Sequence, residues 1–158
     1  MRWLLLIAVA LVVTPAANAT FSIAITATTV TAQGVTLNGV DQTKPFTVAA
    51  TEIDTSNTTG WNITAASTTL TSGAHTLPSL IVTTVSSAAC TGFRCVNPTT
   101  DRTWPLTLSA TPVKIYNALN GTGTGTMVIT GTFEVTYPAN AFPGTYTATI
   151  TLATFAGP

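Results

Sequence analysis

Apolar and polar residues alternate with a period of two along most of the chain. In the final segment, residues 144–158, Tyr146, Ala148 and Ile150 fall on one side of an extended backbone while threonines fall on the other. Residues 21–26 and 132–137 alternate in the same way. Each of these segments is therefore predicted to be a strand with one buried face.

Further strands are predicted where short apolar segments are rich in β-branched and aromatic residues. These segments lie at residues 35–37, 46–53, 61–65, 80–85, 106–109, 113–116 and 126–129. Turn-forming pairs such as Asn-Gly, Ser-Gly and Pro-Gly separate them. About eight to ten short strands without room for crossover helices predict an all-β fold, an antiparallel β-sandwich of the immunoglobulin-like, Greek-key type. A single sheet closed on itself is the alternative.

The N-terminus has the features of a secretory signal peptide. Arg2 precedes an apolar stretch at residues 3–13, and the small-residue sequence Ala-Asn-Ala ends at residue 19. We expect residues 1–19 to be cleaved and residues 20–158 to form a single domain. A membrane anchor is the alternative, but the apolar stretch is well short of the about 20 residues that a spanning helix needs. The mature chain is therefore expected to be extracellular and to lack a membrane span.

Charged side chains are sparse. The chain has five Lys and Arg residues and five Asp and Glu residues, and Arg2 belongs to the expected signal peptide, which leaves four basic side chains against five acidic ones. Nucleic acid recognition needs clustered Lys and Arg, so this class of partner is excluded. Threonine is expected to cover much of the surface, because it favours extended backbone and its hydroxyl tolerates water.

Cys90 and Cys95 are the two cysteines of the chain. In an exported protein a pair at this spacing predicts a disulfide. The closed loop is short, so the bond holds the loop more than it holds the fold. Phe93 and Arg94 lie at the loop tip and Trp104 borders the loop, which makes these three residues candidates for contact with a partner. An ordinary exposed loop is the alternative.

Candidate catalytic chemistry is scarce. His75 is the single histidine, and no cysteine lies near it in the sequence. A metal centre or an activated nucleophile would need such neighbours. Glu52 and Asp54 alternate on one predicted strand, which is more typical of a solvated face than of paired catalytic carboxylates. We expect no catalytic residues, no metal ligands and no cofactors, and therefore a protein that is not an enzyme.

Four segments, in this order, resemble the WxL-type cell-surface domains of bacteria. They read FSIAIT at 21–26, TEIDTSNTTGWNITAAS at 51–67, SGAHTLP at 72–78 and FEVTYPANAFPGTYTATITLATFAGP at 133–158. The residues that match the family's motifs are Gly60, Trp61, Ile63, Gly144, Tyr146 and Ile150. The resemblance implies an exported β-sandwich, and many members associate non-covalently with the cell wall or with other surface proteins.

The chain departs from the family pattern near its C-terminus. The family's second Trp-x-Leu motif is replaced there by Leu-Ala-Thr, which begins at Leu152, whereas Trp104 begins a Trp-Pro-Leu tripeptide at a different place. Trp61 is expected in the core between the sheets, with ligand contact as the alternative. Tyr146, just after Pro-Gly, is expected to fix the register of the final strand.

These features predict a secreted, non-enzymatic protein at the surface or in the wall of a bacterium. It would act in adhesion or in surface-layer assembly, with a cell-wall polymer or other surface proteins as partners. A fibre or pilus-like subunit that self-associates by strand exchange is the alternative. That alternative rests on the Gly-Thr-Tyr closing strand, which spore-coat-U-like and fimbrial subunits share.

Overall fold

Two packed β-sheets make up the protein. The computed structural model describes residues 6–13, 21–25, 29–32, 34–54 and 59–158, and for 6–13, 21–25, 29–32, 50–54 and 93 it describes the backbone alone. The described residues form thirteen strands and no helix. The predicted all-β sandwich is therefore confirmed.

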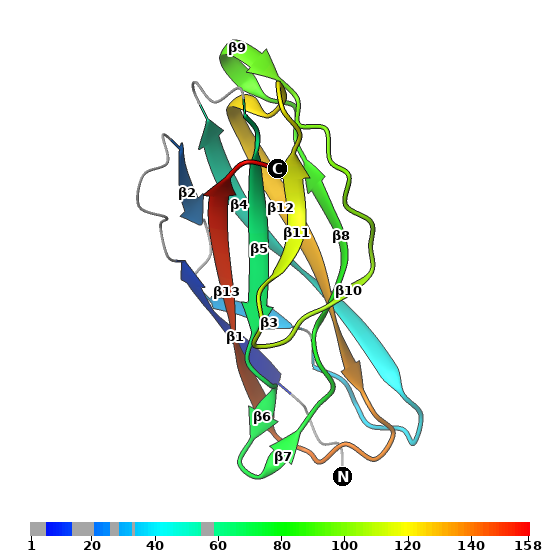
Figure 1. Ribbon diagram of the computed structural model, residues 1–158. Coiled ribbons are helices and arrows are strands. Elements are labelled where there is room, and N and C mark those ends of the chain that lie inside the picture. The colour runs from blue at the N-terminus through cyan, green and yellow to red at the C-terminus, as the bar shows by residue number, and fades with distance from the viewer. Residues whose placement is uncertain (1–5, 14–20, 26–28, 33, 55–58) are drawn as a thin grey trace.

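The first sheet has the strand order β11-β5-β13-β1-β3, with β6 beside β13 and β7 beside β6 (Figure 1). Its strands are β1 (Leu6–Val13), β3 (Thr29–Ala32), β5 (Trp61–Ser67), β6 (Thr71–Ser72), β7 (His75–Thr76), β11 (Val113–Ala118) and β13 (Thr145–Ala156). β13, the last strand in the sequence, lies in the middle of this sheet. Its pairing with β5 is antiparallel and its pairing with β1 is parallel.

The second sheet has the order β10-β8-β12-β4-β2, and β9 pairs with an end of β12. Its strands are β2 (Phe21–Ile25), β4 (Gln42–Asp54), β8 (Ile81–Ser87), β9 (Thr91–Val96), β10 (Leu106–Thr107) and β12 (Thr124–Tyr137). β4 and β12 form a long ladder that runs without interruption from Gln42↔Tyr137 to Asp54↔Gly125.

The core lies between the sheets, where the two central strands bury every second residue. On β12 the buried positions run from Gly125 to Tyr137, and on β13 they run from Tyr146 to Thr154. Threonines occupy most of the alternate positions, which are partly or fully exposed. The alternation seen in the sequence thus corresponds to one face on the core and one face toward solvent.

The sequence pattern predicts two separate strands where the second sheet has one continuous strand. The segments predicted at 126–129 and 132–137 are parts of the single strand β12, which passes through Gly131. Gly131 lies in the buried row, and a Cβ there would be 2.8 Å from the ring of Phe133. The Phe133 ring, stacked on Phe46 at a centroid distance of 5.5 Å, fills the place of the missing side chain.

Other differences concern short elements. The predicted strand at 35–37 is reduced to a single bridge at Thr36, although Val35 is buried. Residues 91–96, predicted as a loop, form β9, which is irregular because Gly92 and Arg94 both have positive φ. The two-residue strands β6 and β7 form a small hairpin that the sequence pattern does not reveal.

Part of the expected signal peptide has a place in the fold. Residues 6–13 form β1, beside β13, while residues 1–5 and the expected cleavage site at residue 19 lie outside the described residues. Within the described part of the chain, no helix has the length and apolar character needed to cross a membrane.

Candidate functional site

The Gly-Trp motif marks the start of β5. Gly60 has a φ of 73°, and a Cβ at this position would collide with the carbonyl oxygen of Ala118 on β11. The side chain of Trp61 is completely buried, and its indole Nε1 donates a hydrogen bond of 2.8 Å to the carbonyl oxygen of Gly123. Glycine and tryptophan are both needed here, because the backbone turns tightly and the indole then enters the core.

The glycine-rich segment at 121–125 belongs to the packing of this indole. A Cβ on Gly123 would be 2.6 Å from the indole nitrogen of Trp61, and Gly123 N donates a hydrogen bond of 3.0 Å to the carbonyl oxygen of Val96. Gly123 also has a φ of 75°. The segment therefore holds neighbouring chain segments together, and its glycines allow close approach of the backbone.

The second motif forms a corner where the chain enters β13. The ring of Tyr146 is buried, and its hydroxyl donates a hydrogen bond of 3.0 Å to the carbonyl oxygen of Phe142, four residues earlier. A tyrosine that bonds back to the preceding backbone fixes the angle and register of the strand it begins. Ile150, four residues further along the strand, is completely buried.

The two motifs are neighbours in space. β5 and β13 pair antiparallel up to Trp61↔Ala156. Just beyond this pair, Gly157 N donates a hydrogen bond of 2.9 Å to the carbonyl oxygen of Gly60, and Asn62 Nδ2 donates one of 2.8 Å to the carbonyl oxygen of Gly157. The Gly-Trp motif and the closing strand thus form one hydrogen-bonded unit.

Leu-Ala-Thr, at the place of the family's distal motif, lies within this unit. Leu152 pairs in register with Ala65, and Thr154 pairs with Ile63. Both Leu152 and Thr154 are 5% exposed. The first position of the missing Trp-x-Leu motif therefore points into the core, where this chain carries a smaller side chain than tryptophan.

The predicted disulfide between Cys90 and Cys95 is confirmed, with the two Cα atoms 5.8 Å apart. It closes the β9 segment at one end of the sandwich (Figure 1). Arg94 is exposed and has a φ of 58°, whereas the side chain of Phe93 lies outside the described residues. The loop therefore presents at least one cation to solvent.

Trp104, the third residue of the predicted contact loop, does not lie beside this tip. Its ring is partly buried and stacks on Tyr116, with centroids 6.4 Å apart and planes 18° apart. Its Nε1 donates a hydrogen bond of 3.1 Å to the carbonyl oxygen of Ile115. The structure thus separates Trp104, which packs on β11, from Arg94 at the end of the molecule.

A polar cluster that the sequence pattern did not indicate lies on β11. Asn117 is 1% exposed, and its Oδ1 accepts hydrogen bonds from Thr100 Oγ1 at 2.8 Å and from Asp101 N at 3.3 Å. Its Nδ2 has no hydrogen-bond partner among the described residues. An isolated Asn in a strand gives no signal of its burial, because the segment that covers it comes from 15 or more residues away.

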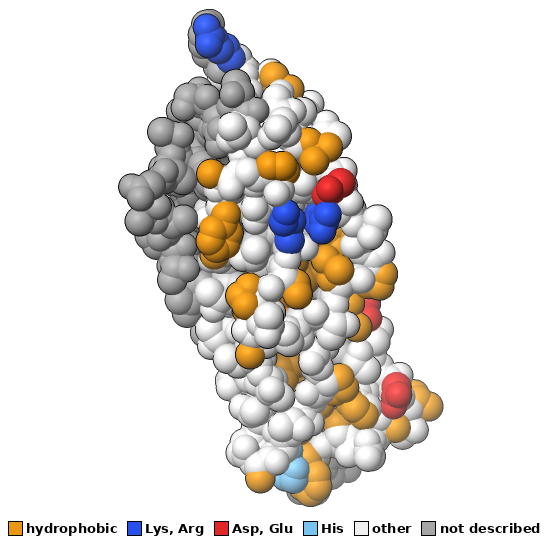
Figure 2. Space-filling model, in the orientation of Figure 1, with side chains coloured by type: hydrophobic (Ala, Val, Ile, Leu, Met, Phe, Trp, Pro, Cys, Tyr) orange, Lys and Arg blue, Asp and Glu red, His pale blue; other side chains and the backbone are white. Residues whose placement is uncertain are grey.

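Basic side chains gather near this cluster on the outer face of the first sheet. Arg102 Nε contacts Asp101 Oδ1 at 2.8 Å, and this hydrogen bond lowers the pKa of the exposed Asp101 carboxyl. Lys114 lies opposite Thr64 on the same outer face as Asn117. Figure 2 shows two basic side chains side by side on this face, with an acidic side chain next to them. Phe155, in register with Asn62, is 47% exposed.

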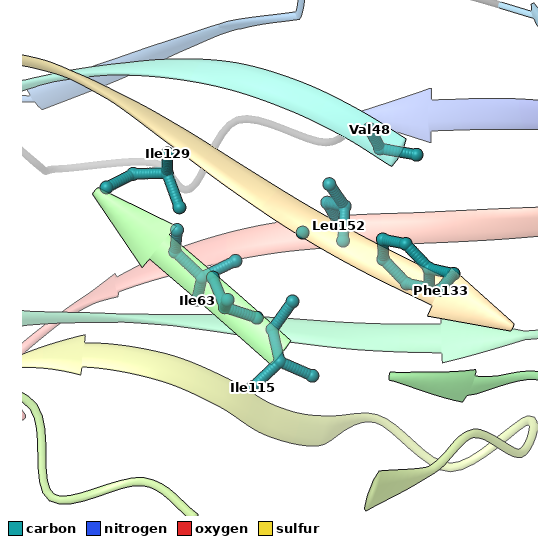
Figure 3. A pocket seen from close by; sticks show the side chains of 8 residues that line it. Val48, Ile63, Ile115, Ile129, Phe133 and Leu152 are labelled. Carbon is teal, nitrogen blue, oxygen red and sulfur yellow. The ribbon is translucent and has the colours of Figure 1, made fainter. Parts of the chain in front are cut away.

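The cavity between the sheets is small and apolar. Its volume is about 20 Å³, and side chains from both sheets point into it (Figure 3). The lining residues are Val48, Ile63, Val85, Ile115, Ile129, Gly131, Phe133 and Leu152, none of which carries a polar side-chain atom. A space of this size, without polar partners, is a packing gap beside Gly131 rather than a substrate site.

His75 lies on β7, in the hairpin that β6 and β7 form. Its ring is exposed and stacks on Phe142, with centroids 3.9 Å apart. In the part of the chain that the structure describes, no group of three or more His, Cys, Asp and Glu residues is arranged to hold a metal ion.

Comparison of the sequence with protein-family models and with curated proteins found no match.

Proposed function

We propose that this chain is an exported, non-enzymatic protein of the cell surface or cell wall of a bacterium, with a role in adhesion or surface-layer assembly. The Cys90–Cys95 disulfide supports export, because such bonds persist in oxidising compartments. The few charges and the threonine-rich solvent face suit a structural surface protein that keeps its fold without a ligand.

The observation that carries this proposal is the contact between the two motif segments. Gly60 and Asn62, which flank Trp61, lie almost 100 residues before the end of β13, yet each forms a hydrogen bond with Gly157, the residue after that strand. The residues that resemble WxL-type domains thus lie on two neighbouring strands of the first sheet.

The outer face of the first sheet is the proposed contact surface. Arg102 and Lys114 supply positive charge, and Phe155 supplies an exposed aromatic ring. Charged donors beside an aromatic ring suit a cell-wall polymer that carries anionic groups, or an acidic surface protein. Arg94, in the disulfide loop, is a second and smaller contact candidate.

The test is sedimentation of the exported protein with purified cell wall. We expect binding that weakens at high salt and that falls about tenfold when Arg102 and Lys114 are both changed to glutamine. Lys44→Gln, on β4 of the other sheet, is the matched control and should bind normally. Equal binding by the double variant and the control would exclude this face, and retention of the protein inside the cell would contradict the proposal itself.

A second candidate function, a self-associating fibre subunit, is favoured by a different observation. β1, which pairs with residues 145–152 of β13, belongs to the segment expected to be lost on export. A strand partner that disappears on maturation leaves an edge for another chain.

A further inference from the structure

β1 fills a slot in the first sheet between β13 and β3 (Figure 1). It pairs in parallel with β13 from Leu6↔Thr145 to Val13↔Leu152. On its other side it pairs antiparallel with β3, from Ile7↔Ala32 to Ala10↔Thr29. The slot therefore accepts a single extended segment.

The slot is apolar on its core side. The alternate residues of β13 from Tyr146 to Leu152 are 5% exposed or less. The β1 residues opposite them in register are all aliphatic, namely Ile7, Val9, Leu11 and Val13. An occupant of this slot thus needs a large apolar residue at every second position.

Removal of residues 1–19, on which this inference rests through the proposed export, takes β1 away. Residues 145–152 of β13 then lose the partner on one side, and β3 loses the only described strand with which it pairs. Unpaired backbone N–H and C=O groups on a sheet edge are a template for another strand.

The second sheet offers a strand that meets the requirements of this edge. β2 pairs with β4 on one side, and no described strand pairs with its other side. Its sequence FSIAI repeats the alternation of residues 7–11, IAVAL, with Phe21, Ile23 and Ile25 at the positions of the large aliphatic residues.

We propose that the edge of β13 uncovered by export binds β2 of a second copy of this chain. Within one chain, a β2 that moves into the slot has to leave β4, which strips residues 50–54 of a partner. A second copy can add β2 through its free edge while its own β2–β4 pairing is kept. Because two different edges meet, the contact can repeat head to tail, which builds a ring where the rotation between copies closes and an open filament where it does not.

The test uses cysteine cross-linking between two variants of the exported protein. The protein is expressed with its own leader and purified after export, and mass spectrometry reads its N-terminus. Ser22→Cys marks β2, and Thr147→Cys marks an exposed position of β13. When the two are mixed, we expect a 22–147 intermolecular disulfide at least about tenfold above the level of a mixture in which the exposed Thr36→Cys replaces Ser22→Cys.

The full chain provides a matched control, because it retains β1 in the slot. The Thr147→Cys variant of residues 1–158 is kept in the cytoplasm so that the leader stays attached, and is oxidised after purification so that Cys90 and Cys95 pair as in the exported protein. Mixed with exported Ser22→Cys, it should cross-link no more than the Thr36→Cys mixture. Circular dichroism and tryptophan fluorescence check that each variant is folded.

Several outcomes would overturn the inference. A chain that carries both cysteines and forms the 22–147 bond while it stays monomeric by light scattering would mean that β2 refills its own slot. A monomeric exported protein with no cross-link would mean that the edge binds no strand. A retained leader would remove the premise and contradict the proposed export, whereas a cleaved leader without cross-linking would leave the proposed function intact.

Discussion

The imidazole ring of His75 lies flat on the phenyl ring of Phe142, with centroids 3.9 Å apart and planes 6° apart. This stack joins the β6–β7 hairpin to the turn that precedes β13. We expect His75→Ala to lower the free energy of unfolding by about 0.5 to 1 kcal/mol, because an aromatic pair adds about that much beyond its buried area. Urea unfolding of both single variants and the double variant with Phe142→Ala measures the coupling. Val40→Ala, at an exposed loop position, should change stability little.

Gly60→Ala tests the close approach at the start of β5. The substitution forces an L side chain into a left-handed backbone and into the Ala118 carbonyl, so we expect a loss of about 3 kcal/mol or more. Gly73→Ala is a matched control, because Gly73 has a φ of 59° but no atom lies within 4 Å of the place that a Cβ would take. The control should lose about 1 kcal/mol. Thermal unfolding of the pair gives the comparison, and equal losses would show that conformation alone sets the requirement for glycine.

Tyr146→Phe tests the corner before β13. The variant keeps the buried ring but leaves the Phe142 carbonyl oxygen without its donor, which should cost about 1 to 1.5 kcal/mol. Tyr116→Phe removes a hydroxyl that donates a hydrogen bond of 3.2 Å to Ser87 Oγ. The Ser87 hydroxyl, which loses its donor, can rotate toward another partner. We therefore expect the smaller loss for Tyr116→Phe. The reverse order in guanidinium unfolding would contradict a register-fixing role for Tyr146.

Tyr137 should make the protein sensitive to alkaline pH. Burial raises the pKa of its phenol from 10.0 to about 12, because the charged phenolate is disfavoured in the core. In the unfolded chain the phenol ionises near pH 10, so the stability it contributes is complete below that pH and is lost as pH rises toward 12. The expected loss is about 2 to 3 kcal/mol. Tyr137→Phe should show a flatter decline over this range when unfolding is followed from pH 8 to 12.

Loss of the disulfide should have a local effect. The loop between Cys90 and Cys95 is short, so replacing both residues by serine should lower the free energy of unfolding by about 2 kcal/mol at most. The amide protons of β9 should then exchange faster, while those of β13 stay protected. Global unfolding of the double variant at room temperature would contradict this local role.

The long elements of the fold follow from the sequence because strand periodicity is local. Tyr146, Ile150 and their neighbours alternate with threonines, and this pattern is sufficient to predict β13 and its buried face. The Cys90–Cys95 bond is likewise predictable from spacing and from the expected compartment. The sequence does not predict that β12 continues through Gly131, because Phe133 covers the glycine only in the packed structure.

The polar cluster at Asn117 illustrates what periodicity cannot reveal. Its burial depends on Thr100 and Asp101, which cross over β11 from a distant segment. The separation of Trp104 from Arg94 has the same origin, because closeness in sequence says little where the chain runs along the length of a sandwich. Sites that depend on contacts between such segments can be found only from the tertiary structure.

The long ladder between β4 and β12 has a mechanical consequence. Its backbone hydrogen bonds lie across the strands, and its register continues from Gln42↔Tyr137 to Asp54↔Gly125. Tension that pulls the two strands in opposite directions along their axes loads these hydrogen bonds together in shear, so they break as a group rather than one after another. The second sheet is thereby suited to resist a force that slides β4 along β12.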